Sequence, residues 1–375
     1  MKNILFIWND FSNMGGVERI ILKTFRLFDK NRYKKYLCCL FGKKKMHDIL
    51  LSDIKKEGIQ IFTLNTTVER FSPKALLKLA HLMHTLKIDI IRSYSIYANR
   101  YGLLAARLAG VKNVVCSYHS IYSFPVSRKT YFMDTIIYSN CKALIVSSEK
   151  MKQHCLTRFH FNPSKIFIVN DGLNLKDLPV YIDKDKEKTK QTLKINKEKI
   201  IITVGRLEPV KKFDLLIESF NSIEKQFPDV ILLIIGDGSQ KDSLASLVAH
   251  LNLSEKVRFL GYQKNVFHFL SIADIFILTS QYEGSPLVVL EAMAMGLPVV
   301  STDVGNCREL LTHQDYECGI IFPVGDKDKL ISDVLSLLKN GKKRKEMSSL
   351  AKERIENDFS LEKEKRFYDQ LFDAL

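Results

Sequence analysis

Two glutamates stand near the ends of an otherwise apolar stretch, QYEGSPLVVLEAMAMGLPVV at residues 281–300. The carboxylates of Glu283 and Glu291 can accept hydrogen bonds from vicinal hydroxyl groups, such as those of a sugar or a ribose. DIFILTS, just before the stretch, predicts a buried strand, so Glu283 lies in the loop at the strand's C-terminal tip. The apolar segment predicts a helix, with Glu291 about one and a half turns into it. We therefore expect both glutamates to contact one ligand lying across the start of this helix.

The start of the same helix is suited to an anion. Pro286 fits the first helical position, where its missing N–H costs nothing. The backbone N–H groups of Leu287 and Val288 then lack partners within the helix and can meet phosphate oxygens, next to Ser285 in the loop. Hydroxyl-binding acids and phosphate-binding amides in one segment indicate a nucleotide or a nucleotide-linked sugar.

A second polar loop follows another predicted strand in VGRLEPVKKFDLLI. Arg206 comes directly after the strand, and Lys211 stands just before the next helix. Two positive charges five residues apart across such a loop suit a diphosphate, because arginine offers a planar fork and lysine a point charge. Lys212 is the less favoured of the two adjacent lysines. We interpret Gly236–Gly238, in IIGDGS, as architecture near a nucleotide and not as a contact.

The first half of the chain offers weaker signals. Gly15 and Gly16 precede a helix, where paired glycines let backbone N–H groups approach an anion, although a plain strand-to-helix turn has the same pattern. His119 ends a predicted strand beside Ser117, Tyr118 and Ser120. That position favours a polar site, whereas a lone histidine is more often a packing residue.

Strand-like runs alternate with helical periods along the chain, which predicts α/β architecture with parallel sheets covered by helices. We expect two doubly wound domains, because ligands of such sheets bind beyond the C-terminal ends of the strands, where the polar residues lie. The predicted strands are NILFIW, YKKYLCCLF, IQIFTL, IDIIRSY, NVVCSYH, ALIVSS and KIFIVNDG, then IIITVGRL, VILLIIGDG, KVRFLGY, DIFILTS, LPVVSTDV and GIIFPV.

Charge separates the two halves. Residues 1–182 carry 29 Lys and Arg against 12 Asp and Glu, whereas residues 183–375 carry 28 against 30. Residues 183–199 are charged and poor in apolar side chains, so we predict a linker with a short helix there. We expect an N-terminal domain over 1–182, a C-terminal domain over 200–355 and a C-terminal helix over 356–375.

Composition narrows the class of protein. The chain is 46% hydrophobic and 26% charged, and no apolar run reaches the roughly 20 residues that span a bilayer. Nothing marks export, and the seven cysteines are odd in number and form no CxxC pair, so we expect buried thiols in a cytoplasmic protein. The basic pI of about 9.3 would suit nucleic acid, but no recognised nucleic-acid motif is present.

The motifs together resemble one large family. The E-x7-E spacing of Glu283 and Glu291, VGRLEPVKKFDLL, EGSPLVVLEAMAMGLPVVSTDVG and GGVER are similar to retaining, GT-B-fold nucleotide-sugar glycosyltransferases of family 4. The resemblance covers nearly the whole chain and is strongest over residues 200–325. It implies two Rossmann-like domains with parallel sheets facing a central cleft, the donor in the C-terminal domain and the acceptor largely in the N-terminal one. It also implies that the C-terminal helix crosses back to the first domain, and that no metal or other cofactor is needed.

Roles carry over residue by residue. The resemblance implies that Arg206 and Lys211 hold the diphosphate and that Glu291 binds ribose. It implies that Glu283 contacts the donor sugar near the reacting carbon. Gly16 would approach the phosphate and His119 would line the sugar site.

The chain also departs from the family pattern at two places. Lys211-Lys212 stands where Lys-Gly is usual. NDGLN at residues 170–174 stands where Pro-Asn-Gly is usual. These departures leave the substrates open.

The leading hypothesis is a hexosyltransferase that moves a sugar from a UDP- or GDP-sugar to a glycan or lipid-linked acceptor in bacterial-type surface polysaccharide or glycolipid synthesis. A nucleotide-sugar epimerase or a phosphorylase of the same shape is an alternative. The intact E-x7-E pair argues against the epimerase, and no cofactor-bearing lysine identifies a phosphorylase. A catalytically silent binding subunit of a polysaccharide-assembly complex is the alternative from a different class, although Arg206, Lys211 and both glutamates are present.

A peripheral contact with the inner face of an anionic membrane is a further hypothesis for the basic half. Residues 117–139 interleave aromatic residues with Arg128 and Lys129, and residues 43–45 are lysines. Such a pattern suits a lipid boundary, and it equally suits aromatic residues packed on the sheet. The aromatic residues concerned are Tyr118, Tyr122, Phe124, Tyr131 and Phe132.

Overall fold

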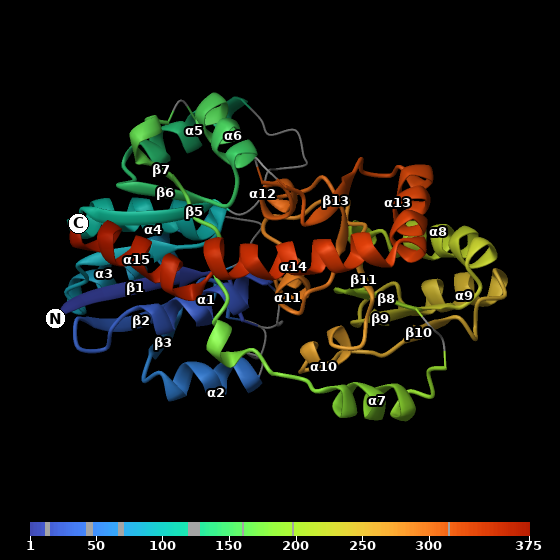
Figure 1. Ribbon diagram of the computed structural model, residues 1–375. Helices are drawn as coiled ribbons and strands as arrows, with labels where there is room; N and C mark the ends of the chain where they lie inside the picture. Colours follow the sequence, from blue (N-terminus) through green and yellow to red (C-terminus); the bar gives the residue numbers. More distant parts are fainter. Residues whose placement is uncertain are drawn as a thin grey trace. The chain divides into compact units, whose positions relative to one another are not determined.

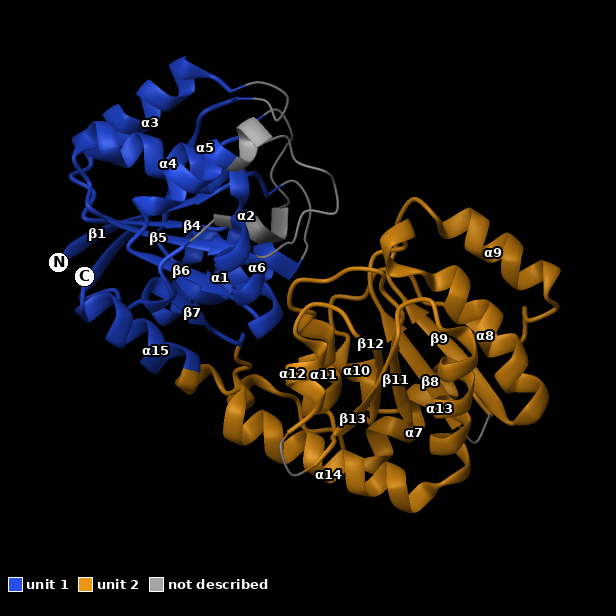
Figure 2. Cartoon of the chain, turned by 90° about the horizontal axis from the view of Figure 1, so that it is seen from above, with its two compact units in different colours: residues 1–171, 364–375 blue, residues 172–363 orange. Residues whose placement is uncertain are grey.

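The computed structural model describes residues 1–11, 16–42, 48–66, 71–118, 128–159, 161–196, 199–313 and 316–375. The chain forms two compact units, residues 1–171 with 364–375 and residues 172–363, which Figure 2 shows in blue and orange. The first chain segment of the first unit therefore ends at Asp171, which is earlier than the domain boundary that we placed at residue 182. The segment 183–199 falls within the second unit and begins with the helix α7 (Asp183–Thr192).

A seven-stranded parallel sheet forms the centre of the first unit (Figure 1), with the strand order β3-β2-β1-β4-β5-β6-β7. Its strands are β1 (Lys2–Trp8), β2 (Tyr33–Cys39), β3 (Gln60–Thr63), β4 (Ile90–Ser93), β5 (Asn113–Tyr118), β6 (Ala143–Val146) and β7 (Ile166–Ile168). Each of these strands lies in one of the predicted apolar runs. The strand order reverses between β1 and β4, which is where open α/β sheets bind ligands.

Helices connect these parallel strands. They are α1 (Gly16–Leu27), α2 (Asp48–Lys56), α3 (Pro73–Thr85), α4 (Ile96–Ala109), α5 (Arg128–Ser139) and α6 (Glu149–Phe159), with the short η1 (Pro163–Lys165). The start of α3 shows why the sequence specifies them. The Ser72 hydroxyl accepts a hydrogen bond from Ala75 N at 3.2 Å, and Pro73 occupies the first helical position.

The second unit has a six-stranded parallel sheet with the order β10-β9-β8-β11-β12-β13. Its strands are β8 (Lys199–Val204), β9 (Val230–Ile235), β10 (Val257–Phe259), β11 (Ile275–Leu278), β12 (Val299–Thr302) and β13 (Gly319–Phe322). Its helices, besides α7, are η2 (Leu175–Asp177), η3 (Pro209–Lys211), α8 (Phe213–Gln226), α9 (Lys241–His250), α10 (Phe267–Leu270), α11 (Leu287–Ala294), α12 (Cys307–Leu311), α13 (Lys327–Lys339) and α14 (Gly341–Asp358). The order of this sheet reverses between β8 and β11.

Both faces of the second sheet are buried. Ile200, Ile202 and Val204 of β8 pack in one apolar cluster, and Ile201 packs in another on the opposite face. Helices on both faces explain why these strands are continuous apolar runs and show no alternation of polar and apolar residues. With two parallel sheets covered by helices, the predicted fold class is confirmed.

The C-terminal helix that we expected over 356–375 is present but starts later, because the first residues of that range belong to the preceding helix. α14 ends at Asp358, and α15 (Leu361–Asp373) begins after a break. In the break the chain pairs with Leu173, whose N–H donates to Phe359 O and whose carbonyl accepts from Leu361 N, each at 2.8 Å. These backbone bonds interrupt the helix.

Residues 364–375 complete the first unit. Lys23 Nζ of α1 lies 2.9 Å from Asp171 Oδ1 and 2.7 Å from Glu364 Oε2. The buried guanidinium of Arg92 donates to the Tyr368 hydroxyl at 3.1 Å. Lys23 therefore joins α1 to the end of the first chain segment of this unit, at Asp171, and to the start of its second segment, at Glu364.

All seven cysteines are buried and free, as we expected. Among the described residues, no helix combines the length and the apolar composition that a bilayer crossing requires.

Candidate active site

The predicted donor-site residues follow neighbouring strands of the second sheet, at its reversal point. Arg206 and Lys211 follow β8, and Glu283 follows β11, which pairs with β8 through Ile275 and Phe276. β12, on the other side of β11, leads into Gly305 and Asn306. The carboxyl edge of β8 and β11 therefore gathers the charged residues, and β12 adds an asparagine, as the parallel topology requires.

Glycines hold the loop after β8 in place. Gly236 has φ +141°, and a Cβ there would lie 1.8 Å from Gly205 O, so only glycine permits this approach. Leu207 N then donates to Asp237 O at 2.9 Å. The architectural role that we predicted for Gly236–Gly238 agrees with this geometry. Arg206 is exposed between these anchors.

Lys211 and Glu283 form an ion pair. Lys211 Nζ lies 2.5 Å from Glu283 Oε1, and both side chains are mostly buried. The Ser280 hydroxyl donates to the same Oε1 at 2.7 Å. Thr279 Oγ1 donates to Lys211 O at 2.9 Å, so the two loops are also joined through the backbone. These contacts fix the cation and the carboxylate relative to each other.

Lys212 has a left-handed backbone, with φ 53° and ψ 43°. A residue with a side chain is strained in this conformation, and glycine is not. The chain needs this turn because η3 ends at Lys211 and α8 begins at Phe213. The strain gives a physical reason why glycine suits this position.

Helix α11 begins one residue later than predicted. Pro286 is extended, with ψ 95°, and precedes the helix, which starts at Leu287. Val289 N donates to Pro286 O at 2.9 Å, whereas no described residue accepts a hydrogen bond from the N–H groups of Leu287 and Val288. The two amides that we selected are therefore available to an anion, although Pro286 lies outside the helix.

Glu291 is the fifth residue of α11 and only 1% exposed. A buried carboxylate requires hydrogen-bonding partners, because burial of an unpaired charge is costly. The ribose-binding role of Glu291 stays a prediction.

Two neighbouring groups have shifted pKa values. Hydrogen bonds from Ser239 lower the pKa of Glu208. Burial raises the pKa of the Cys307 thiol to about 12, so it is protonated at neutral pH.

The first unit holds fewer of the predicted residues in described positions. Gly16 is the exposed first residue of α1, and Glu18 in the same turn accepts from Trp8 Nε1 at 3.2 Å. Gly15 and His119 lie outside the described residues. Tyr118, just before His119, is buried.

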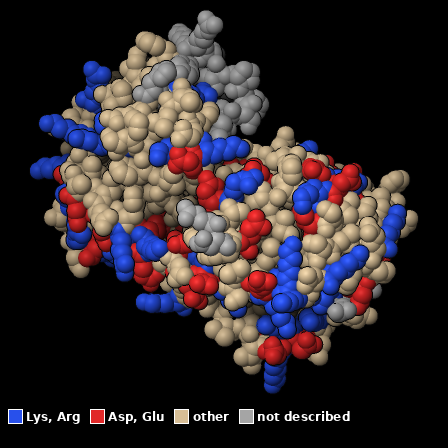
Figure 3. Space-filling model, turned by 45° about the horizontal axis from the view of Figure 1, so that its top comes forward, with Lys and Arg blue, Asp and Glu red and all other residues tan. Residues whose placement is uncertain are grey.

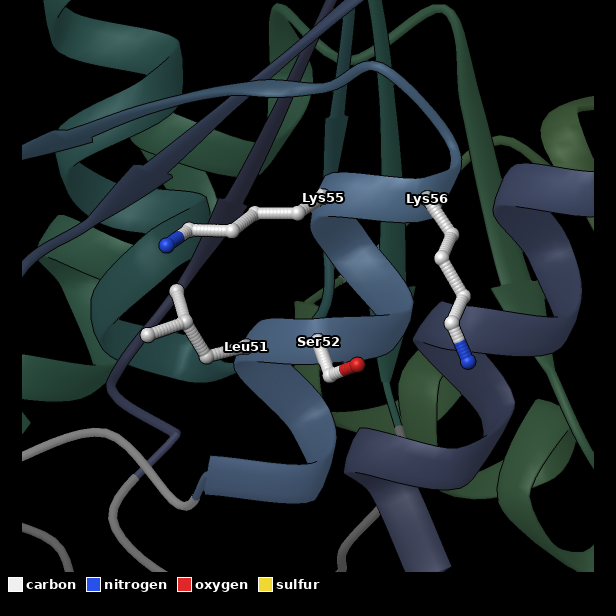
Figure 4. Close-up of a pocket in the computed structure, with 4 residues that line it drawn as sticks. All are labelled: Leu51, Ser52, Lys55 and Lys56. Atoms are coloured by element: carbon white, nitrogen blue, oxygen red, sulfur yellow. The ribbon is translucent and has the colours of Figure 1, made fainter.

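A pocket of about 540 Å³ lies on α2 of the first unit and is lined by Leu51, Ser52, Lys55 and Lys56. The side chains of Leu51 and Lys55 extend to one side of the helix, and Lys56 points away from them (Figure 4). None of the predicted site residues lines this pocket. It is therefore no part of the candidate site.

Two family models identify the class of this protein, and a solved structure shows its fold. The model "Glycosyl transferases group 1" matches residues 184–354, and "Glycosyltransferase Family 4" matches residues 14–177. The structure of HepE from Anabaena, solved in complex with UDP, aligns with a TM-score of 0.85 over 100% of both chains, at 19% identity. The chain is a GT-B glycosyltransferase.

Two relatives show how far the similarity of this glycosyltransferase extends. It is 28% identical over 363 residues to the UDP-Gal:alpha-D-GlcNAc-diphosphoundecaprenol alpha-1,3-galactosyltransferase of Escherichia coli, covering 93% of this chain and 91% of the relative. It is 34% identical over 206 residues to the N-acetyl-alpha-D-glucosaminyl L-malate synthase of Bacillus anthracis, covering 53% of each.

We did not select from the sequence two residues that lie at the carboxyl edge of the second sheet. Ser280 contacts Glu283, and the buried Asn306 donates from Nδ2 to Ser285 Oγ at 3.3 Å. Ser280 is the last residue of one predicted strand, and Asn306 lies shortly after the end of another. A search for uncharged polar side chains at the ends of strands would have found Ser280.

Proposed function

We propose that this glycosyltransferase moves a sugar, with retention of configuration, from a UDP- or GDP-sugar to a glycan or lipid-linked acceptor. The observation that carries the proposal is the Lys211–Glu283 pair beside the available N–H groups of Leu287 and Val288. A cation, a carboxylate and two amide donors at one sheet edge match the parts of a nucleotide-sugar. Retention rests on the family resemblance.

The reaction requires stabilisation of a departing nucleoside diphosphate. The bond between the sugar carbon and the donor phosphate oxygen breaks, the acceptor hydroxyl oxygen bonds to the same carbon, and the hydroxyl proton passes to the departing phosphate. Negative charge grows on the leaving phosphate, where Arg206, Lys211 and the α11 amides act as preorganised donors. Glu283, already fixed by Lys211 and Ser280, contacts the sugar, and Glu291 binds the ribose.

The acceptor proposal draws on the relative that matches along most of its length. That relative's name gives a GlcNAc-diphosphoundecaprenol acceptor. The relative named for L-malate matches over about half of each chain. We therefore propose a lipid-linked acceptor in bacterial surface polysaccharide or glycolipid synthesis, with the enzyme on the cytoplasmic side.

We further propose that transfer needs no metal ion. Within the described ranges, no three His, Cys, Asp or Glu residues gather in a way that could hold one. Arg206 and Lys211 would supply the positive charge that a metal provides in other transferases.

A membrane contact of the first unit is part of the same proposal. On α5, Phe132, Met133 and Ile136 are exposed, by 66%, 49% and 48%, and helical spacing places them on one face. Arg128 and Lys129 begin this helix. Apolar side chains at the lipid boundary, with cations at anionic headgroups, would hold the enzyme near a lipid-linked acceptor.

One aromatic residue must be removed from this hypothesis, because Tyr118 is only 1% exposed and packs inside the unit. Tyr122, Phe124 and residues 43–45 lie outside the described residues. On the face shown in Figure 3, basic and acidic side chains are mixed, so long-range attraction there is limited. The exposed apolar side chains of α5 are therefore the described residues on which the membrane hypothesis depends.

Two experiments test these proposals. The first supplies the enzyme with a panel of UDP- and GDP-sugars and with either GlcNAc-diphosphoundecaprenol or L-malate as acceptor, and follows product formation. If the enzyme transfers sugar to L-malate and to no lipid-linked acceptor, the acceptor proposal is wrong.

The second experiment is liposome co-sedimentation. The double variant Phe132→Ser/Ile136→Ser should bind anionic vesicles less than the control Leu77→Ser, in which the substituted leucine is exposed on a different helix, α3. Equal binding of all variants would contradict the membrane contact.

A further inference from the structure

Asn306 immediately precedes α12 but does not cap it. Its side chain accepts no hydrogen bond from the first N–H groups of the helix, although asparagine at this position usually does so and contributes about 1 kcal/mol. Asn340, which precedes α14, shows the usual arrangement, because it accepts from Lys343 N at 2.9 Å. The carboxamide of Asn306 instead turns toward the loop before α11, where Nδ2 lies 3.3 Å from Ser285 Oγ.

The rest of the Asn306 carboxamide is buried without compensation. The residue is 0% exposed, and within the described part of the chain no donor reaches its Oδ1. A buried acceptor without a donor costs about 1–3 kcal/mol. Asn306 therefore gives up a helix cap and leaves an acceptor unsatisfied while it contacts Ser285. Such a cost at a ligand-binding edge indicates a role that stability does not explain.

A close backbone approach sets the position of Asn306. Gly305 has φ +57°, and a Cβ there would lie 2.4 Å from Gly284 O. The loop after β12 thus rests on the backbone of the loop after β11, and only glycine allows this spacing. Thr302 Oγ1 also donates to Ser280 O at 2.8 Å. Asn306 is therefore fixed beside Ser285 by the same contacts that join the two loops.

The direction of the hydrogen bond has a consequence for Ser285. When Nδ2 donates to Oγ, the hydroxyl oxygen is the acceptor and its own proton is directed elsewhere. Ser285 stands two residues before Leu287, whose N–H is available to an anion along with that of Val288. The Ser285 hydroxyl is thereby free to act as a third donor, from a side chain, in addition to the two backbone donors.

We propose that Asn306 is a positioning residue that directs the Ser285 hydroxyl proton toward the diphosphate of the donor. The inference rests on the proposed function, because it takes the anion at α11 to be that diphosphate. Asn306 itself does not touch the ligand. It sets the tightness of diphosphate binding through one hydroxyl group.

The test measures UDP and GDP binding by calorimetry, with the melting temperature of each variant. Ser285→Ala and Asn306→Ala should each weaken binding about tenfold, as expected for one hydrogen bond to a charged group. The double variant should bind no more weakly than either single one, because both remove the same donor. The control Asn340→Ala should lower the melting temperature and leave the affinity unchanged.

Asn306→Asp separates positioning from a structural role. Aspartate has the same shape and can cap α12, so a structural role predicts the milder effect. Positioning predicts weaker binding than Asn306→Ala, because the carboxylate attracts the Ser285 proton and repels phosphate. Near-normal binding by Asn306→Asp, or additive losses in the double variant, would overturn the inference alone. Failure of the wild-type enzyme to bind any nucleoside diphosphate would overturn the proposed function as well.

Discussion

Lys211 and Glu283 lie 2.5 Å apart, from Nζ to Oε1, although they follow different strands of the second sheet. The cation of the expected phosphate site is thus paired with the acid of the expected sugar site. A donor substrate that places a phosphate near Lys211 and a sugar hydroxyl near Glu283 would contact both members of this pair, its nucleotide half at the cation and its sugar half at the acid. Loss of either partner should therefore affect both halves.

Replacement of either basic residue should slow transfer strongly. For Arg206→Ala and for Lys211→Ala we expect kcat to fall about a hundredfold or more, since one preorganised charge contact contributes about 3 kcal/mol to the transition state. Steady-state kinetics with the best donor measures the effect. Lys212→Ala is the matched control, with kcat close to wild type. Near-normal turnover in both variants would contradict the phosphate-binding role.

The two glutamates should differ in what they affect. Glu291→Gln should mainly weaken nucleotide binding, whereas Glu283→Gln should mainly lower kcat, because one acid holds ribose and the other contacts the reacting sugar. Calorimetry with UDP and GDP, together with turnover assays, separates the two effects. If Glu291→Gln binds its nucleotide as tightly as wild type, the ribose role is wrong.

Glycine at position 212 should stabilise the protein. Lys212 has φ 53°, and relief of left-handed strain contributes about 1 kcal/mol, partly offset by the greater chain entropy of glycine. We expect a higher melting temperature for Lys212→Gly and none of this gain for Lys212→Ala, which keeps the strain. Equal melting temperatures for the two variants would show that the turn is not strained.

Transfer should survive chelation. Activity measured after dialysis against EDTA should equal that of untreated enzyme, since Arg206 and Lys211 supply the positive charge. If chelation abolished activity and added Mg²⁺ or Mn²⁺ restored it, the proposal that transfer needs no metal ion would be wrong.

The cluster around Lys23 should stabilise the first unit in a pH-dependent way. Burial lowers the pKa of Lys23, but the carboxylates of Asp171 and Glu364 raise it by more, so the net shift is upward. The stabilisation is therefore full below the ordinary lysine pKa of about 10.4 and is lost as the pH rises through the higher folded-state value.

The substitution Lys23→Met tests this stabilisation, because it leaves two buried carboxylates without their cation. It should cost about 3 kcal/mol in the free energy of unfolding at pH 7. Urea denaturation measures the loss, and Lys23→Met/Glu364→Gln should recover part of it. No difference between wild type and Lys23→Met would contradict a stabilising cluster.

The fold could be predicted because parallel strands buried on both faces leave a strong signal. β9, VILLII, is an unbroken apolar run, and every predicted run in both halves contains a strand. The break at Phe359 and Ser360 could not be predicted, because it depends on backbone pairing with Leu173, far away in sequence. Helical periodicity alone does not report such a contact.

For the site, charge and position after a strand were enough to select Arg206, Lys211 and Glu283, of which the last two meet. Their functional roles await the experiments above. Asn306 was missed because its type and spacing match an ordinary helix cap. Only the direction of its side chain distinguishes it, and direction is a property of the folded chain.

The contacts of Lys23 also have a consequence for biosynthesis. Asp171 precedes the whole second unit in the chain and Glu364 follows it, yet both carboxylates belong to the first unit. During translation the first sheet is made early, but Arg92 and the apolar side chains under α15 stay uncovered until the second unit has been synthesised. Domains usually complete their folding in the order of synthesis. Here the unit that is begun first is finished last, so its exposed edge must be tolerated or protected throughout that interval.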